Sequence, residues 1–144
     1  MATTNDGPYL TAALICEKVL QEKDETVSII RMIDRVTLTV PASASPETLP
    51  PLPLNLSAFI SLKSGSARGR QTVKWRTETP SGIKLAEQLL PVLFEGEDRG
   101  TNLILTLNIV VDQEGVYWFD VLLEDELLTR IPLRILYQRI GQSI

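Results

Sequence analysis

The chain has 144 residues, of which 44% are hydrophobic and 22% are charged, and it contains no histidine and a single cysteine, Cys16. This composition is typical of a globular domain with its own core, and it excludes histidine-dependent catalytic triads and zinc sites, thiolate clusters and an intrachain disulfide. The formal net charge of −4 argues against non-specific binding to nucleic acid or to an anionic membrane.

The first residues are polar and acidic, with neither a cationic run nor an apolar block. We therefore expect residues 1–8 to be a flexible N-terminus rather than a secretory signal. No segment approaches the ~18 continuous apolar residues that a membrane span needs. Together with the lone cysteine this favours a cytoplasmic location, and the length favours a single domain over residues 1–144.

The N-terminal third alternates between apolar and polar residues, which predicts β-strands. Residues 10–20 alternate as in a strand, but their alanines and the charged pair at 17 and 18 also suit a helix. We favour a strand, because the polar run 22–25 then forms a hairpin turn. Residues 26–40, rich in Val, Ile and Thr, predict one further long strand.

A proline-rich segment covers residues 41–53. Because proline lacks the amide hydrogen that a sheet ladder needs, we expect an extended crossover loop between two sheets. Strands are predicted over 54–62 and 72–77, and Trp75 should point inward. The segment 83–94, interrupted by Pro91, stays open between an edge strand and a helical turn.

The C-terminal third has the clearest alternation. It predicts strands over 103–111, 117–123 and 127–137, separated by short polar turns. Pro132 cannot donate to a ladder, which places the last strand at a sheet edge or at a bulge. The whole pattern predicts an all-β fold, an antiparallel two-sheet sandwich of the immunoglobulin-like type with about seven or eight strands.

Two resemblances accompany this pattern. The segment Gly115–Phe119 resembles the start of strand F in immunoglobulin-like domains, where a tyrosine placed like Tyr117 forms a tyrosine corner. Phe119 stands where many such domains carry a disulfide cysteine, and Trp75 where strand C carries a buried tryptophan. A second resemblance, to a family of small bacterial proteins of unknown function, implies a bacterial cytosolic sandwich without an assigned catalytic residue. It is carried by Leu14–Glu17, Ser28–Ile30, Ile33–Arg35, Gly115–Tyr117 and Ile131–Leu133.

An apolar stripe that faces away from the core is the main candidate site. If Tyr117, Phe119 and Val121 face inward, the residues between them face outward, where a half-buried sheet should carry mainly polar side chains. A tryptophan among aliphatic residues there is instead typical of a protein interface. The partner-binding residues predicted in this way are Trp118, Leu122, Val116, Ile104 and Val110. The alternative is that the 41–53 loop or the N-terminal segment covers this face within the monomer.

Other clusters of polar residues have a simpler interpretation. The basic hairpin over 63–76 and the acidic loops are interpreted as solvated surface rather than as a nucleic-acid or calcium site. Cys16, in an apolar alternation, is expected to be a small core residue. Asp34 and Asp120 lie within strand patterns, so either could be functional, and the simpler interpretation is that both face solvent.

The sequence therefore predicts a non-enzymatic protein-interaction or self-association module. Its partner would be another protein or a second copy, and we expect no catalytic residue, no cofactor and no metal. The alternative is a module that binds a small ligand or a carbohydrate through loops at one end of the sandwich, where residues 95–100 are the expected place.

Overall fold

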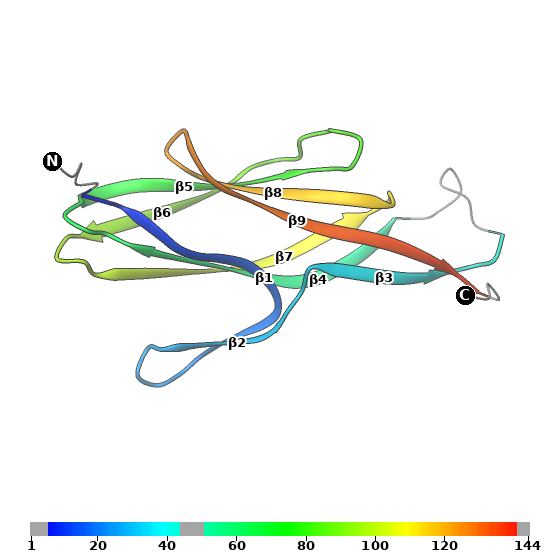
Figure 1. Ribbon diagram of the computed structural model, residues 1–144, viewed down its shortest axis with the longest axis horizontal. Helices are drawn as coiled ribbons and strands as arrows, with labels where there is room; N and C mark the ends of the chain where they lie inside the picture. The colour runs from blue at the N-terminus through cyan, green and yellow to red at the C-terminus, as the bar shows by residue number, and fades with distance from the viewer. Residues whose placement is uncertain (1–5, 44–50, 141–144) are drawn as a thin grey trace, which may run out of the picture.

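The computed structural model describes residues 6–43 and 51–140, which form two β-sheets packed face to face (Figure 1). The described residues contain nine strands and no helix, so none of them forms a helix that could cross a membrane. The strands are β1 (Tyr9–Gln21), β2 (Val27–Met32), β3 (Arg35–Val40), β4 (Leu52–Lys63), β5 (Arg68–Glu78), β6 (Gln88–Glu95), β7 (Gly100–Val111), β8 (Gly115–Leu123) and β9 (Glu126–Arg139).

The all-β sandwich predicted from the alternation is confirmed, with more strands than expected. The long strand predicted over 26–40 is divided into β2 and β3, and residues 88–95 of the undecided segment form β6. Residues 10–20 belong to a strand, as favoured. The flexible N-terminus predicted for 1–8 lies outside the described residues over 1–5, and the predicted crossover loop does so over 44–50.

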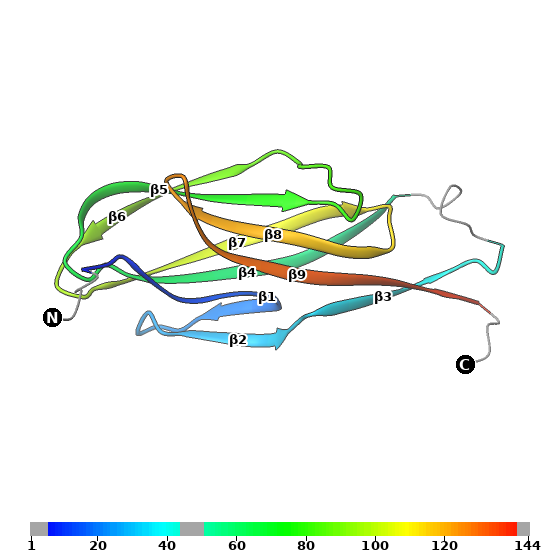
Figure 2. The same cartoon turned by 45° about the horizontal axis from the view of Figure 1, so that its top comes forward.

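The strand order is that of an immunoglobulin-like sandwich. One sheet has the order β2-β1-β4-β7 and the other the order β3-β9-β8-β5-β6 (Figure 2). Neighbouring strands are antiparallel except β3 and β9, which run parallel. In immunoglobulin nomenclature, β1, β4 and β7 take the places of strands A, B and E, and β5, β8 and β9 those of C, F and G. Within the described residues no strand takes the place of D, next to β7.

The core is organised around three aromatic residues. Trp75, Tyr117 and Phe119 are almost completely buried. The rings of Trp75 and Phe119 stack with centroids 5.3 Å apart, at the place where a disulfide would pack on the tryptophan. Such a pair contributes about 0.5–1.5 kcal/mol beyond its area burial. The Tyr117 hydroxyl accepts a hydrogen bond from the Asp112 backbone N–H at 3.3 Å, which forms the corner that the resemblance implies.

Two irregularities shape the second sheet. β9 pairs with β3 only from Arg134 onward, so Pro132 lies where β9 has no strand on that side and needs no ladder donor. Val121 pairs with Thr129 and Leu122 with Leu127, which makes Leu128 an extra, bulged residue. The bulge turns Leu128 inward, so Leu127 is exposed and Leu128 packs against the core.

Candidate protein-interaction site

The stripe predicted from the sequence is divided between two sheets. Val116, Trp118 and Leu122 lie on β8 in the five-stranded sheet, whereas Ile104 and Val110 lie on β7 in the four-stranded sheet. The prediction that these five residues share one face is therefore wrong. The prediction fails because the turn between β7 and β8 connects one sheet to the other and does not close a hairpin.

The β8 half of the stripe is largely covered by the chain itself. Leu122 is only 8% exposed. Trp118 is half-buried, and the Arg130 guanidinium lies over its ring at 4.6 Å from the centroid, within the range of a cation–π contact. This face therefore presents an arginine where the alternation predicted an open indole.

The centre of the same face is a paired ionic network. Asp120 is 4% exposed, so its predicted solvent-facing position is wrong. Its carboxylate accepts hydrogen bonds from Arg130 Nε at 2.7 Å and from Arg76 Nη2 at 3.1 Å, and Arg130 also binds Glu78 at 2.7 Å. The hydrogen bond to Asp120 raises the pKa of Arg130. Because each charge has its partner, the network explains how a carboxylate is buried here without a ligand.

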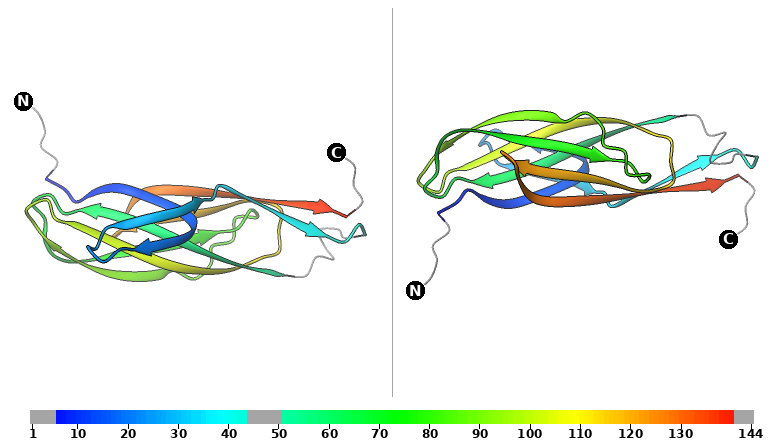
Figure 3. Two further views of the ribbon diagram at one scale, coloured as in Figure 1. Left: turned by 90° about the horizontal axis from the view of Figure 1, so that it is seen from below. Right: turned by 90° about the horizontal axis from the view of Figure 1, so that it is seen from above.

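The β7 half of the stripe is at an open edge. β7 pairs over its whole length with β4, from Gly100 opposite Lys63 to Val111 opposite Leu52. No other strand of the described residues pairs with β7. Figure 3 shows β7, in yellow-green, along one margin of the four-stranded sheet.

The direction of the β7 backbone groups follows from the register. The Ser64 N–H donates to the Arg99 carbonyl at 2.9 Å, so these two residues form a hydrogen-bonded pair just before the strand begins. Hydrogen-bonded and non-hydrogen-bonded pairs alternate along an antiparallel ladder, and no bulge interrupts this one. The even-numbered residues of β7 therefore direct N–H and C=O to the open edge. After Gly100 at the start of the strand, they are Asn102, Ile104, Thr106, Asn108 and Val110.

The same residues carry the exposed side chains of β7. Ile104 is 43% exposed and Val110 56%, whereas Leu105 and Leu107 point into the core. β7 contains no charged residue. Near its end, β4 and β7 line a shallow groove of about 230 Å³ that includes Val110. Within the described part of the chain, the edge thus offers unpaired backbone groups beside apolar and amide side chains.

The other three sheet edges carry features that discourage pairing. β2 and β3 have only six residues each. β2 is also interrupted by Arg31, whose φ of 55° is in the left-handed region. β6 is longer but contains Pro91, opposite Thr72 of β5.

Pro91 removes a donor from the open side of β6. The Thr72 N–H donates to the Glu124 carboxylate at 2.9 Å, and its carbonyl accepts from the Glu124 N–H at 2.8 Å, so the Thr72 backbone faces β8. Thr72 and Pro91 are therefore a non-hydrogen-bonded pair, and the Pro91 nitrogen faces away from β5. β7 has no proline, no charge and no bulge, which makes it the least protected edge of the described part of the chain.

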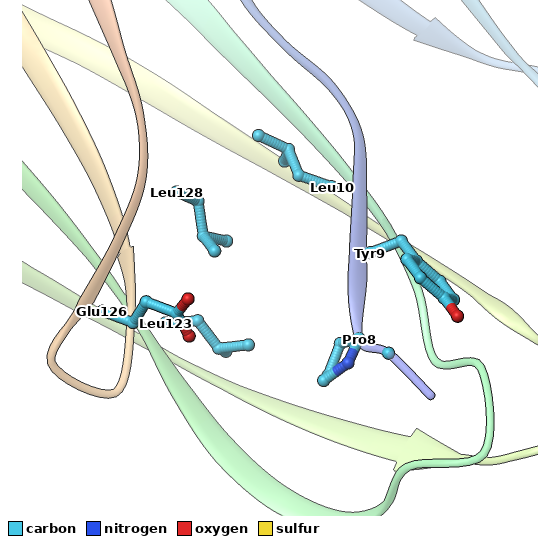
Figure 4. Close-up of a pocket in the computed structure, with 7 residues that line it drawn as sticks. Pro8, Tyr9, Leu10, Leu123, Glu126 and Leu128 are labelled. Carbon is cyan, nitrogen blue, oxygen red and sulfur yellow. The ribbon is translucent and has the colours of Figure 1, made fainter. Parts of the chain in front are cut away.

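A second hollow lies between the two sheets, where β1 begins beside the β8–β9 hairpin. Its volume is about 310 Å³. Figure 4 shows Leu10, Leu123 and Leu128 turned toward this groove, with the Glu126 carboxylate at its rim and the Tyr9 ring turned away. This groove offers apolar contact from its leucine side chains and polar groups from the Glu126 carboxylate and the rest of its lining.

The end loops form a third hollow, lined mainly by polar residues. Asp6, Ser66, Glu97 and Asp98 line about 270 Å³ beside Tyr9, a residue that is 39% exposed. The Glu97 carboxylate lies 3.8 Å from both Arg68 and Arg99. Over 6–43 and 51–140 no three acidic or cysteine side chains gather to hold a metal ion.

Cys16 is a buried residue, as the sequence predicts. It is fully buried in β1. Burial raises the pKa of its thiol, which keeps the group protonated and unreactive at neutral pH.

The fold is that of an immunoglobulin-like β-sandwich domain, and among the described residues its β7 edge has no pairing strand. Over residues 11–136 the sequence matches the family described as "Family of unknown function (DUF6941)", and the chain belongs to that family. No curated protein matches the chain in sequence.

Similar folds occur in solved structures of distant sequence. A β-glucosidase from Listeria innocua is 9% identical with a TM-score of 0.53, and the match covers 92% of this chain and 16% of that one. A DNA-bound alkylpurine DNA glycosylase, AlkC, from Pseudomonas fluorescens is 14% identical with a TM-score of 0.45, over 71% of this chain and 27% of that one. An immunoglobulin-like protein from Pseudomonas aeruginosa is 13% identical with a TM-score of 0.43, and the match covers 87% of this chain and 97% of that one. The chain spans a small part of the first two, and the likeness to the glucosidase shows the fold alone.

Proposed function

We propose that this chain is a non-enzymatic protein-interaction domain whose β7 edge binds an extended polypeptide strand. The observation that carries the proposal is the row of backbone donors and acceptors at Asn102, Ile104, Thr106, Asn108 and Val110, which no described residue occupies. An added strand would satisfy these groups and would lie where strand D lies in related sandwiches.

The contrast with β6 supports this function. The two strands are edges of the same sandwich, yet only β6 has a proline with its nitrogen at the open side. Open edges without such protection tend to pair with other chains. The exposed Ile104 and Val110 would give an added strand apolar contacts on one face, and Asn108 would give it a polar one.

A phage-displayed library of extended peptides tests this function. We expect the immobilised domain to select uncharged, alternating peptides that no longer bind after Thr106→Pro, which removes an open-edge donor. Thr106→Ala keeps the donor and should retain binding. Leu93→Pro makes the matched change on the open side of β6 and should also retain binding. Selected peptides that bind Thr106→Pro as well as wild type would refute a role for the β7 edge.

A second function, recognition of a small ligand or carbohydrate at the end loops, is supported by one observation. Tyr9 is an exposed aromatic ring beside Ser66, Glu97 and Asp98, and such rings pack on the apolar faces of sugars while nearby carboxylates accept hydroxyl donors. Calorimetric titration with a panel of oligosaccharides would test it. Binding that Tyr9→Ala abolishes would support this function, and an absence of heat with every sugar would refute it.

A further inference from the structure

We infer that the strand at the open edge is β7 of a second copy of this chain. Two four-stranded sheets then join across a two-fold axis into one continuous antiparallel sheet. The inference rests on the proposed function of the β7 edge, and it adds the identity of the occupant and the register of the pairing.

The backbone of β7 is suited to pairing with itself. In a two-fold interface the same surface of both copies must be self-complementary. An antiparallel pair meets this condition, because the two residues of each hydrogen-bonded pair exchange both N–H···O=C bonds. The open-edge groups of β7 alternate without interruption from Asn102 to Val110, so they can continue this exchange along the strand.

The absence of charge favours a second copy over a charged partner. Each chain carries a net charge of −4, so two copies repel each other over most of their surfaces. β7 has no charged residue, and β4, its neighbour on the same outer face, has none over residues 52–62. An acidic or basic partner would find no opposite charge on this half of the sheet. Two uncharged edges of this kind can approach without like charges facing each other.

One register gives both exposed aliphatic residues of β7, Ile104 and Val110, an aliphatic partner. If the two-fold axis passes at Leu107, Ile104 lies opposite Val110 of the second copy and Thr106 lies opposite Asn108. Apolar residues then meet apolar ones, and polar residues meet polar ones. An axis at Thr106 would instead place Ile104 opposite Asn108, which leaves the amide against an aliphatic side chain. We therefore place the axis at Leu107.

Sedimentation equilibrium over a wide concentration range is the first test. A contact made by one strand pair is at the small end of protein interfaces, so the dimer should dissociate on dilution. We expect the mass to rise from 16.0 kDa toward twice that value as concentration increases. Thr106→Pro should raise the dissociation constant about thirtyfold, because two N–H donors are lost per dimer. Leu93→Pro on the β6 edge should leave the dissociation constant unchanged.

A complementary charge pair tests the register. Ile104→Lys and Val110→Glu change exposed side chains, so both variants should fold. Each alone places two charges opposite apolar residues and should be monomeric. Mixed in equal amounts they should dimerise, since Lys at 104 then faces Glu at 110 in one contact and the wild-type pair remains in the other. An axis at Thr106 makes these positions diagonal neighbours, about 7–8 Å apart, instead of opposite each other, and predicts a weaker rescue.

The possible outcomes distinguish failure of this inference from failure of the proposed function on which it rests. A concentration-dependent dimer with rescue by the mixed variants supports the inference. Wild type that stays monomeric at high concentration while library peptides bind β7 refutes the second copy and leaves the proposed function standing. A dimer that survives Thr106→Pro, or a mixture without rescue, refutes the β7 pairing or its register. A monomer that also binds no peptide through β7 refutes both proposals.

Discussion

Replacing single β7 residues by proline should separate the two sides of this strand by their effect on the stability of the monomer. At Thr106 the backbone N–H points to the open edge, so proline removes no hydrogen bond to another strand of residues 6–43 or 51–140. At Leu105 the N–H belongs to the ladder with Ala58, and proline leaves the Ala58 carbonyl without its donor. Alanine variants at both positions correct for the side chains that are lost.

The expected difference follows from the cost of an orphaned buried group. Ala58 is completely buried, so its carbonyl cannot turn to water. An unsatisfied buried acceptor costs about 1–3 kcal/mol. We therefore expect Leu105→Pro to be at least ~2 kcal/mol less stable than Leu105→Ala. Thr106→Pro should be within ~1 kcal/mol of Thr106→Ala, because proline fits edge positions and also lowers the entropy of the unfolded chain.

Urea denaturation followed by tryptophan fluorescence measures both differences. It should be done at micromolar concentration or below, where the proposed dimer has dissociated. Equal proline penalties at Leu105 and Thr106 would show that the Thr106 N–H is engaged within the monomer, and the assignment of the open edge would then fail.

Two further predictions concern charged and titrating groups. Asp120→Ala should lower the urea midpoint clearly more than Asp125→Ala, because the Asp120 carboxylate is buried between Arg76 and Arg130 whereas that of Asp125 is exposed; equal effects would contradict a structural role for the network. Burial raises the pKa of both Tyr117 and Tyr137, so the folded state holds these protons more tightly than the unfolded chain. Their stabilisation is complete below about pH 10, the ordinary tyrosine value, and is lost as pH rises through the folded-state pKa. Urea midpoints that stay level between about pH 9 and about pH 12 would contradict this stabilisation by the two buried tyrosines.

The fold could be predicted because alternation reports burial directly. Residues 103–111 and 117–123 alternate with few exceptions, and their inward residues form the core. Tyr117 and Trp75 indicated an immunoglobulin-like sandwich, since such domains have a tyrosine on strand F and a buried tryptophan on strand C. The sequence does not predict the division of 26–40 into two strands, because the two residues at the break, Ile33 and Asp34, are neither glycine nor proline.

The candidate site could be predicted only in part, because alternation identifies faces and not neighbours. The turn at 112–114 is short enough for a hairpin, so Ile104 and Trp118 were assigned to one face, although the chain changes sheet there. The burial of Asp120 depends on Arg76 and Arg130, which come from two other strands. One signal for the open edge was present in the sequence. Twelve residues without charge or proline form β7, whereas β6 contains Pro91.

Amide hydrogen exchange along β7, measured at low and high protein concentration, tests the central claim most directly. In dilute solution the Ile104 and Thr106 amides should exchange rapidly, while those of Leu105 and Leu107 should be protected by the ladder to β4. On concentration the first pair should become protected and the second should change little. Ile104 and Thr106 amides that are already protected in dilute solution, or that stay unprotected at every concentration, would contradict an open edge that pairs with a second copy.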